Sequence, residues 1–282
     1  MSSKVAVVTG SNKGIGLQTV RNLCTEFNGT VILTARDVER GENAVSQLKQ
    51  EGLSPAFHQL DIDDIESIKK FASFIKTQYG GIDVLVNNAA IAFKHDATEP
   101  FGVQAEQTLK TNYFSLKNVC DNLYPLLRPH ARVVTLSSWC GHLHQIPSLE
   151  LRKKLSDPNL TEEALDALML EFIESAKDGS YSEKGWPGST YVVSKVGASA
   201  LTRIHHQRFL KDPREDIVIN HVHPGYVDTD MTSHKGPLTV VQGAVSSTYA
   251  ALLPENCTSP KGDMIWHNKE IIDWVNGPLP SV

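Results

Sequence analysis

The sequence has few cysteines and no long apolar run. Its four cysteines, Cys24, Cys120, Cys140 and Cys257, are scattered without a C-x-x-C pair, which excludes a disulfide framework or zinc knuckle and favours a reducing compartment. The first apolar run ends at Gly10 and is too short for a secretory signal, and no stretch approaches a membrane span. We therefore expect a cytoplasmic protein with no membrane partner.

The chain also has fewer positively charged than negatively charged residues. The chain carries 27 Lys and Arg against 32 Asp and Glu, a net charge of −5. Proteins that bind nucleic acid without regard to sequence need a basic face to displace counterions from phosphates. We therefore expect no nucleic-acid partner. What is present is ordinary for a globular protein, since 40% of the 282 residues are hydrophobic and 21% are charged.

Short apolar runs alternate with helical patterns along most of the chain. The first run, Val5 to Val8, is continuous, which is typical of a strand buried on both faces. Strands are predicted at 5–8, 30–34, 55–60, 82–86, 132–136, 217–222 and 262–266, and helices at 15–27, 38–50, 64–79, 104–127, 189–211 and 239–253. This alternation predicts one α/β domain over residues 1–282, a Rossmann-type doubly wound parallel sheet flanked by helices.

Residues 141–187 interrupt the alternation. They show no strand pattern, but 161–177 is typical of an amphipathic helix, with Thr161 as its N-cap. Its apolar stripe consists of Leu165, Leu168, Met169, Phe172 and Ile173. We interpret the segment as a helical insertion packed on the domain surface; the alternative is that it covers a face through which related proteins would oligomerise.

A glycine-rich turn joins the first strand to the first helix. It runs Gly10, Ser11, Asn12, Lys13, Gly14, Ile15, Gly16, with the spacing G-x-x-x-G-x-G. Glycines let the backbone turn tightly and approach a pyrophosphate, to which the helix N-terminus presents free amides. Such a turn after the first strand of a βαβ unit predicts a dinucleotide site.

The end of the second strand selects the cofactor. NAD-binding units usually place an acid there to hold the ribose 2′-hydroxyl, whereas this strand ends in Ala35 and Arg36, with Arg40 one turn on. A guanidinium suits a 2′-phosphate, and Lys13 in the glycine turn agrees with that charge. Asp37 is the residue that could be mistaken for the NAD acid. We predict NADPH, the alternative being that Arg36 and Arg40 are solvated charges at a helix start.

Three segments later in the chain carry the remaining candidates. Asp61 ends the third strand and Asn88 the fourth, at the sheet edge where cofactors bind. Tyr191 and Lys195 lie four apart on one helix face, Ser138 ends the fifth predicted strand, and Asn112 lies in the helix before it.

These side chains suit reduction of a ketone. Such a reaction needs a hydride at carbon and a proton at the developing alkoxide. We expect Tyr191 to donate the proton, with the Lys195 ammonium lowering the tyrosine pKa and holding ribose hydroxyls. Ser138 would donate a hydrogen bond to the substrate oxygen, and Asn112 would support a water-linked proton path.

The motifs resemble the short-chain dehydrogenase/reductase family over nearly the whole chain. Gly10 to Gly16, Asn88, Ser138, Tyr191 to Lys195 and the Pro224-Gly225 pair stand in that family's order. The long separation of Ser138 from Tyr191 is similar to that in the monomeric carbonyl reductases, where an inserted helix obstructs the usual dimer face. The resemblance therefore implies a monomer and substrates such as ketones, quinones and aldehydes.

The resemblance also implies roles for individual residues. The catalytic set would be Asn112, Ser138, Tyr191 and Lys195. The cofactor set would be Gly10, Asn12, Lys13, Gly14, Ile15, Gly16, Arg36, Arg40, Asp61, Ile62, Asn88, Tyr191, Lys195, Val227, Asp228 and Thr229.

The paired histidines His142-x-His144 and His221-x-His223 raise the possibility of a metal site. No carboxylate or cysteine stands at a supporting spacing, so we expect no metal and interpret His142, His144 and His223 as walls of the substrate pocket. Two other functions stay open: a dehydrogenase oxidising a specific hydroxysteroid or prostaglandin, and a non-catalytic NADPH-binding sensor. The absent NAD acid argues against the first, and the complete catalytic set against the second.

Overall fold

Eight strands pair into one sheet in the computed structural model, which describes residues 3–94 and 96–280. The strands are β1 (Val5–Val8), β2 (Thr30–Ala35), β3 (Ala56–Gln59), β4 (Ile82–Asn87), β5 (Leu127–Leu136), β6 (Val218–Val222), β7 (Met264–Ile265) and β8 (Ile271–Ile272). Their order is β3-β2-β1-β4-β5-β6-β7-β8, parallel throughout except for the antiparallel pair β7 and β8. The predicted Rossmann-type sheet is confirmed.

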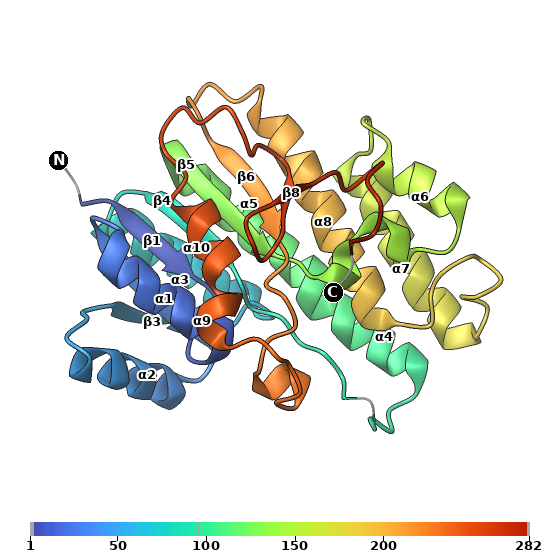
Figure 1. Ribbon diagram of the computed structural model, residues 1–282, viewed down its shortest axis with the longest axis horizontal. Helices are drawn as coiled ribbons and strands as arrows, with labels where there is room; N and C mark the ends of the chain where they lie inside the picture. The colour runs from blue at the N-terminus through green and yellow to red at the C-terminus, as the bar shows by residue number, and fades with distance from the viewer. Residues whose placement is uncertain (1–2, 95, 281–282) are drawn as a thin grey trace.

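Helices cover both faces of the sheet because successive strand side chains point to opposite sides. Val5 and Val7 of β1 belong to one core cluster, and Ala6 and Val8 to the other, all four fully buried. The second cluster includes side chains of α1 (Gly14–Glu26), α2 (Val38–Gln50) and α10 (Val245–Ala251), and the first those of α3 (Ile65–Gln78), α5 (Leu116–Leu123) and α8 (Thr190–Phe209) (Figure 1).

The long helix predicted before the fifth strand is interrupted. It consists of α4 (Phe101–Leu109), a π-helical stretch Lys110–Ser115, and α5. The Asp63 carboxylate accepts hydrogen bonds from Thr111 Oγ1 at 2.9 Å and Ser115 Oγ at 2.7 Å, which hold the π turn against the end of the third strand. Such π turns often mark functional sites.

Other elements differ from the predicted boundaries. The helix predicted at 239–253 is two helices, α9 (Val240–Gly243) and α10, and β5 begins at Leu127 rather than residue 132. Neither β8 nor the eight-residue α6 (Leu149–Ser156) was predicted, because each is too short to show a clear hydrophobic period.

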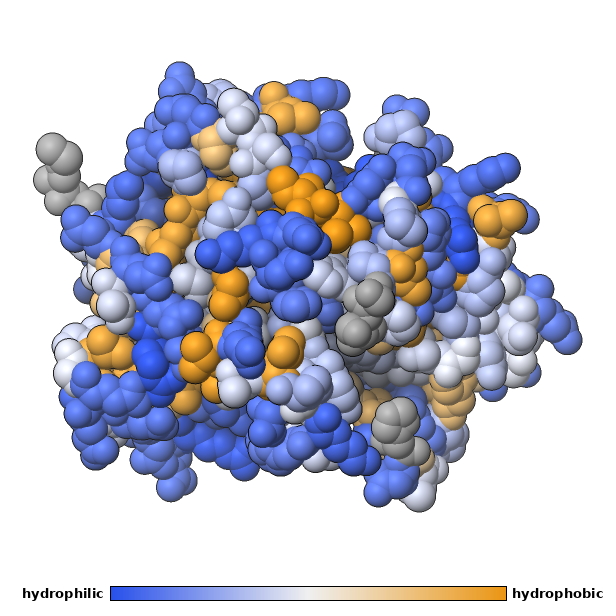
Figure 2. Space-filling view, viewed as in Figure 1, coloured by the Kyte–Doolittle hydropathy of each residue, from blue (hydrophilic) through white to orange (hydrophobic). Residues whose placement is uncertain are grey.

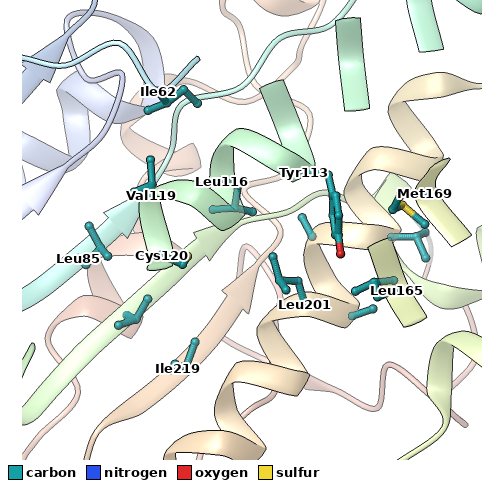
Figure 3. Packing of buried hydrophobic residues seen from close by; sticks show 14 of the residues in the cluster. Ile62, Leu85, Tyr113, Leu116, Val119, Cys120, Leu165, Met169, Leu201 and Ile219 are labelled. Atoms are coloured by element: carbon teal, nitrogen blue, oxygen red, sulfur yellow. The ribbon is translucent and has the colours of Figure 1, made fainter. Parts of the chain in front are cut away.

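The predicted insertion helix is present as α7 (Glu162–Asp178). The Thr161 side chain caps it by accepting from the Ala164 amide at 3.2 Å. Its apolar stripe packs against α4 and α8, and Figure 3 shows Leu165 and Met169 beside Tyr113 of the π-helical stretch. Leu168 is only partly buried, whereas Leu165, Met169, Phe172 and Ile173 are buried. The insertion therefore forms an extra helical layer over α4 and α8.

Within residues 3–94 and 96–280, no helix has both the length and the apolar character needed to cross a membrane. Figure 2 shows one face of the molecule, which is mostly hydrophilic with hydrophobic side chains in separate groups. Large exposed apolar side chains are scattered over several elements, such as Leu149 on α6 and Leu170 on α7.

Candidate active site

A cavity of about 1080 Å³ opens beyond the carboxyl ends of β1, β4 and β5. Its lining includes the glycine turn, the segments after β2, β3 and β4, the end of β5, the first turns of α8, and the loop 224–235. In open parallel sheets this edge is where cofactors and substrates bind. The predicted cofactor and catalytic segments therefore meet at one place.

The glycine turn is shaped for close approach of a ligand. Gly10 and Gly14 adopt positive φ angles of 58° and 59°, which favour glycine. A Cβ atom on Gly16 would lie 2.4 Å from Asn88 Nδ2, so only glycine fits there. Helix α1 begins without a side-chain cap and without an acid in its first turn. Its first amides and the positive end of its dipole fit the pyrophosphate of a dinucleotide.

The residues around the end of β2 fit a 2′-phosphate rather than a free ribose hydroxyl. Arg36 lines the cavity. The Asp37 carboxylate accepts the Arg40 amide at 2.8 Å and caps α2, so this acid is occupied as an N-cap. Arg40 itself lies outside the cavity lining, so the structure does not bring it to the site with Arg36.

Lys13 lies at the cavity mouth with an ion-pair partner. Its ammonium is 2.6 Å from the Asp230 carboxylate, and both side chains are exposed. Lys94 reaches the same loop by donating to the Asp230 carbonyl and to Ser233 Oγ. Sequence reasoning missed this contact, because Lys13 and Asp230 are 217 residues apart in the chain. Lys13 thus connects the loop 224–235 to the glycine turn, and Lys94 connects it to the segment after β4.

The remaining predicted cofactor residues line the cavity as well. Asn12, Ile15, Asp61, Ile62 and Val227 to Thr229 all line the cavity. Asn88 also lines it, and its amide donates to the carbonyls of Thr9 and Gly10, both at 2.9 Å. Asn88 thus holds the start of the glycine turn in place through these two hydrogen bonds. Asp228 Oδ1 pairs with His234 Nδ1 at 2.6 Å, within the same loop.

Tyr191 and Lys195 project from α8 into the cavity. Ser189 caps this helix by accepting from the Val192 amide at 3.3 Å. The Lys195 Nζ atom lies 5.7 Å from the centre of the Tyr191 ring and donates to the Leu136 carbonyl at 2.7 Å. The i, i+4 spacing therefore places a phenol and an ammonium side by side at the end of β5.

The two groups have shifted pKa values. Desolvation lowers the pKa of Lys195 to about 8 and raises the pKa of Tyr191, an effect that the Ser138 hydroxyl opposes. Desolvation is the largest cause of the raised tyrosine pKa in the chain without a bound cofactor, so the lowering expected from sequence stays a prediction. Tyr191 rests in the protonated form, as a proton donor must.

Ser138 lines the cavity directly after β5. Its hydroxyl oxygen accepts the Cys140 amide at 3.2 Å, which fixes the oxygen at the start of a short 3-10 turn. Ser138 and Tyr191 therefore face the same space from two elements, with the glycine turn across the cavity.

Asn112 lies on the π-helical stretch and outside the cavity lining. Its amide exchanges two hydrogen bonds with the Ile91 backbone, at 2.8 Å and 2.9 Å, and donates to Ser194 Oγ at 3.0 Å. The side chain thus joins the segment after β4 to helix α8. The proton path assigned to Asn112 from sequence stays a prediction.

The model of the family described as short chain dehydrogenase matches residues 4–148. The human protein named carbonyl reductase (NADPH) 3 is 47% identical over 274 residues, covering 96% of this chain and 99% of that protein. This chain belongs to the short-chain dehydrogenase family. The pig protein named carbonyl reductase (NADPH) 1 is also 47% identical, over 97% of this chain and 95% of the relative.

Two solved structures have a similar fold over nearly the whole chain. Salutaridine reductase from Papaver somniferum superposes with a TM-score of 0.83 at 32% identity, covering 93% of this chain and 99% of the other. Menthone neomenthol reductase from Mentha piperita gives a TM-score of 0.79 at 29% identity, over 95% and 99% of the two chains.

The prediction that His142, His144 and His223 form pocket walls is wrong for this short-chain dehydrogenase. None of the three lines the cavity, and His142 and His223 are buried behind the turn that follows Ser138. Sequence adjacency to a strand end did not reveal which side of the turn each ring occupies. In the described part of the chain, no group of three or more His, Cys, Asp or Glu side chains is arranged to hold a metal ion.

Sequence reasoning missed Phe93, Phe101, Met231 and Val240, which form much of the apolar part of the cavity lining. Cys140 and Tyr226 also line it. Exposure of Tyr226 and Met231, at 42% and 40%, gives this family member an apolar rim beside the catalytic groups. Burial raises the pKa of the Cys140 thiol, which keeps it in the less reactive neutral form.

Proposed function

We propose that this chain reduces the carbonyl group of small apolar ketones, quinones and aldehydes with NADPH, as a single catalytic domain over residues 1–282. The observation that carries the proposal is the convergence of Ser138, Tyr191 and Lys195 on a cavity that also contains the glycine turn and Arg36. The relatives' names, carbonyl reductase (NADPH), support the same activity. The apolar side chains in the lining, among them Phe93, Phe101 and Met231, support a substrate that is apolar apart from its carbonyl group.

The chain's own groups suit each part of that reaction. The glycine turn, Arg36 and Lys195 would hold NADPH, which would supply the hydride when bound. Ser138 orients the substrate oxygen with a hydrogen bond, and Tyr191 gives that oxygen a proton. The Lys195 ammonium stabilises the negative charge that develops on the phenol oxygen as the proton leaves.

The test is oxidation of NADPH and of NADH by the purified chain with a panel of quinones, aromatic ketones and aldehydes. Turnover that is selective for NADPH is the expected result. Tight NADPH binding without turnover on any panel member would contradict the proposal and favour a sensor. Faster oxidation of a hydroxysteroid or prostaglandin with NADP would favour a dehydrogenase.

Replacing Arg36 by aspartate should erode the preference for NADPH over NADH by about two to three orders of magnitude in kcat/KM. The reason is that a charge-assisted bidentate contact to the 2′-phosphate is lost and a like charge takes its place. The matched control is Arg40→Asp, one turn along but outside the cavity lining, which should change the preference little. An unchanged ratio in Arg36→Asp would refute the role of Arg36.

We also propose a cytoplasmic monomer. All four cysteines are free thiols, which suits a reducing compartment. Helix α7 covers α4 and α8, the surface that the insertion was expected to obstruct. Light scattering should give the mass of one chain at micromolar concentration, and a stable dimer or tetramer would contradict the interpretation of the insertion.

A further inference from the structure

His223 occupies a position behind the catalytic turn that its sequence context did not indicate. It follows β6 directly and is 3% exposed. Its Nδ1 atom accepts hydrogen bonds from two backbone amides, that of Trp139 at 2.8 Å and that of Gly225 at 3.4 Å. One imidazole nitrogen thus joins two loops that come from different parts of the chain.

Both partners can only donate, so Nδ1 must be unprotonated and the ring proton must be on Nε2. Burial lowers the pKa of His223 to about 3, and the neighbouring His267 acts in the same direction. The ring is therefore neutral near pH 7, and Nδ1 is an acceptor there.

Neighbouring groups also hold the residue in place, although Nε2 is buried without a hydrogen-bond partner among the described residues. The His223 amide donates to the Ile265 carbonyl at 2.8 Å, and Ser246 Oγ donates to the His223 carbonyl at 3.2 Å. The imidazole packs on Trp266, with 4.1 Å between ring centres. Because the acceptor is fixed at the end of β6, the amides that it binds are held at a fixed position relative to that strand.

The two loops meet at His223 Nδ1, and each continues into the lining of the cavity. Trp139 directly follows Ser138, and its amide is the first donor of the turn that Ser138 caps. Gly225 precedes Tyr226 and Val227, which line the cavity where the cofactor residues lie. A small shift of either loop changes the distance between the substrate oxygen and the hydride donor.

We propose that His223 is a positioning residue, whose Nδ1 atom holds the Ser138 turn and the Gly225 turn at the spacing that carbonyl reduction requires. The inference rests on the proposed function, since it concerns the geometry of that reaction. This role of His223 differs from ordinary core packing, because it depends on the acceptor atom Nδ1 and not on the volume of the ring.

Three variants separate the acceptor from the ring. His223→Leu removes the acceptor, whereas His223→Asn keeps one, because asparagine Oδ1 is bonded to the same carbon as histidine Nδ1. The matched control is His221→Leu, two residues earlier and on β6, where neither ring nitrogen of a fully buried imidazole has a partner among the described residues. All three are compared by thermal unfolding, by kcat and KM, by NADPH affinity, and by hydrogen exchange of the Trp139 and Gly225 amides.

The expected result is a fall in kcat of about 10- to 100-fold for His223→Leu, with NADPH Kd changed by less than about fivefold. His223→Asn should recover kcat to within about fivefold of wild type. The Trp139 amide should exchange faster in His223→Leu than in His221→Leu. Equal kcat losses in His223→Leu and His221→Leu, or no recovery in a folded His223→Asn, would overturn the inference.

Hydrogen exchange and NADPH affinity keep this result separate from the proposed function. If wild type binds NADPH but reduces no carbonyl compound, the proposed function fails. The exchange of the Trp139 amide in the three variants then still decides whether Nδ1 holds the two turns.

Discussion

Replacing Tyr191 by phenylalanine is expected to lower kcat by about three orders of magnitude while the NADPH Kd stays within about threefold of wild type. The substitution removes only the hydroxyl that gives its proton to the substrate oxygen. The ring remains to fill its place beside Lys195 Nζ, 5.7 Å from the ring centre. Binding and catalysis should therefore separate in this variant.

The measurement combines steady-state rates on a quinone and an aromatic ketone with NADPH titration by fluorescence. Tyr249→Phe is the matched control, since Tyr249 lies on α10 outside the cavity lining and should leave kcat unchanged. A Tyr191→Phe enzyme with near wild-type turnover would show that another group donates the proton, and Cys140 in the same lining would be the first to examine.

The direction of the Tyr191 pKa shift bears on how this donor works. Desolvation raises the pKa in the chain alone, so the hydroxyl is fully protonated before substrate binds. A donor with a high pKa is a weak acid, and it becomes effective only when a positive charge compensates the phenolate as it forms. Lys195 is the cation closest to that role, because α8 carries both side chains one turn apart.

Strands buried on both faces were the easiest part of the fold to predict from sequence. Val5 to Val8 is a continuous apolar run, and Ile82 to Val86 is apolar except for Asp83, so both strands can be predicted without knowledge of distant contacts. The glycine turn was predictable for the same reason, since Gly10, Gly14 and Gly16 meet local demands of backbone angle and close contact.

What sequence could not predict depends on contacts between distant segments. The π turn around Asn112 is held by Ile91 and Ser194, and no local pattern encodes those partners. The short strand β8 exists only because Ile271 and Ile272 pair with β7. Arg40 was placed in the cofactor site by its charge and spacing, but the helix turn carries it outside the cavity lining.

The position of His223 shows the same limit most clearly. Sequence alone interpreted His223 as a wall of the substrate pocket and gave no such role to His221, because no local pattern shows which groups each ring meets. The structure separates them, because only His223 meets the amides of Trp139 and Gly225. Both are buried and neutral, but one is an acceptor for two loops and the other has no ring partner among the described residues.

Replacing Lys195 by methionine is expected to lower kcat by about two to three orders of magnitude and also to weaken NADPH binding. Methionine has a similar length but no charge, so nothing stabilises the phenolate of Tyr191 or faces the cofactor with a positive group. It also leaves the Leu136 carbonyl without the donor that Lys195 supplies at 2.7 Å, so thermal unfolding must be measured beside activity. The control is Lys261→Met, far from this cavity, which should change neither kcat nor Kd.

The lowered pKa of Lys195 gives this residue a distinctive pH signature. Since burial moves its pKa from 10.5 to about 8, the ammonium of the free enzyme is charged below that pH and neutral above it. NADPH is an anion and binds the charged form more tightly, so wild-type affinity should be highest below about pH 8 and fall between about pH 8 and pH 10. In Lys195→Met that fall should be absent, because the titrating group is gone. A wild-type affinity that stays constant over this range, measured by NADPH titration, would show that the Lys195 charge does not contribute to cofactor binding and that its effect on kcat acts through Tyr191 alone.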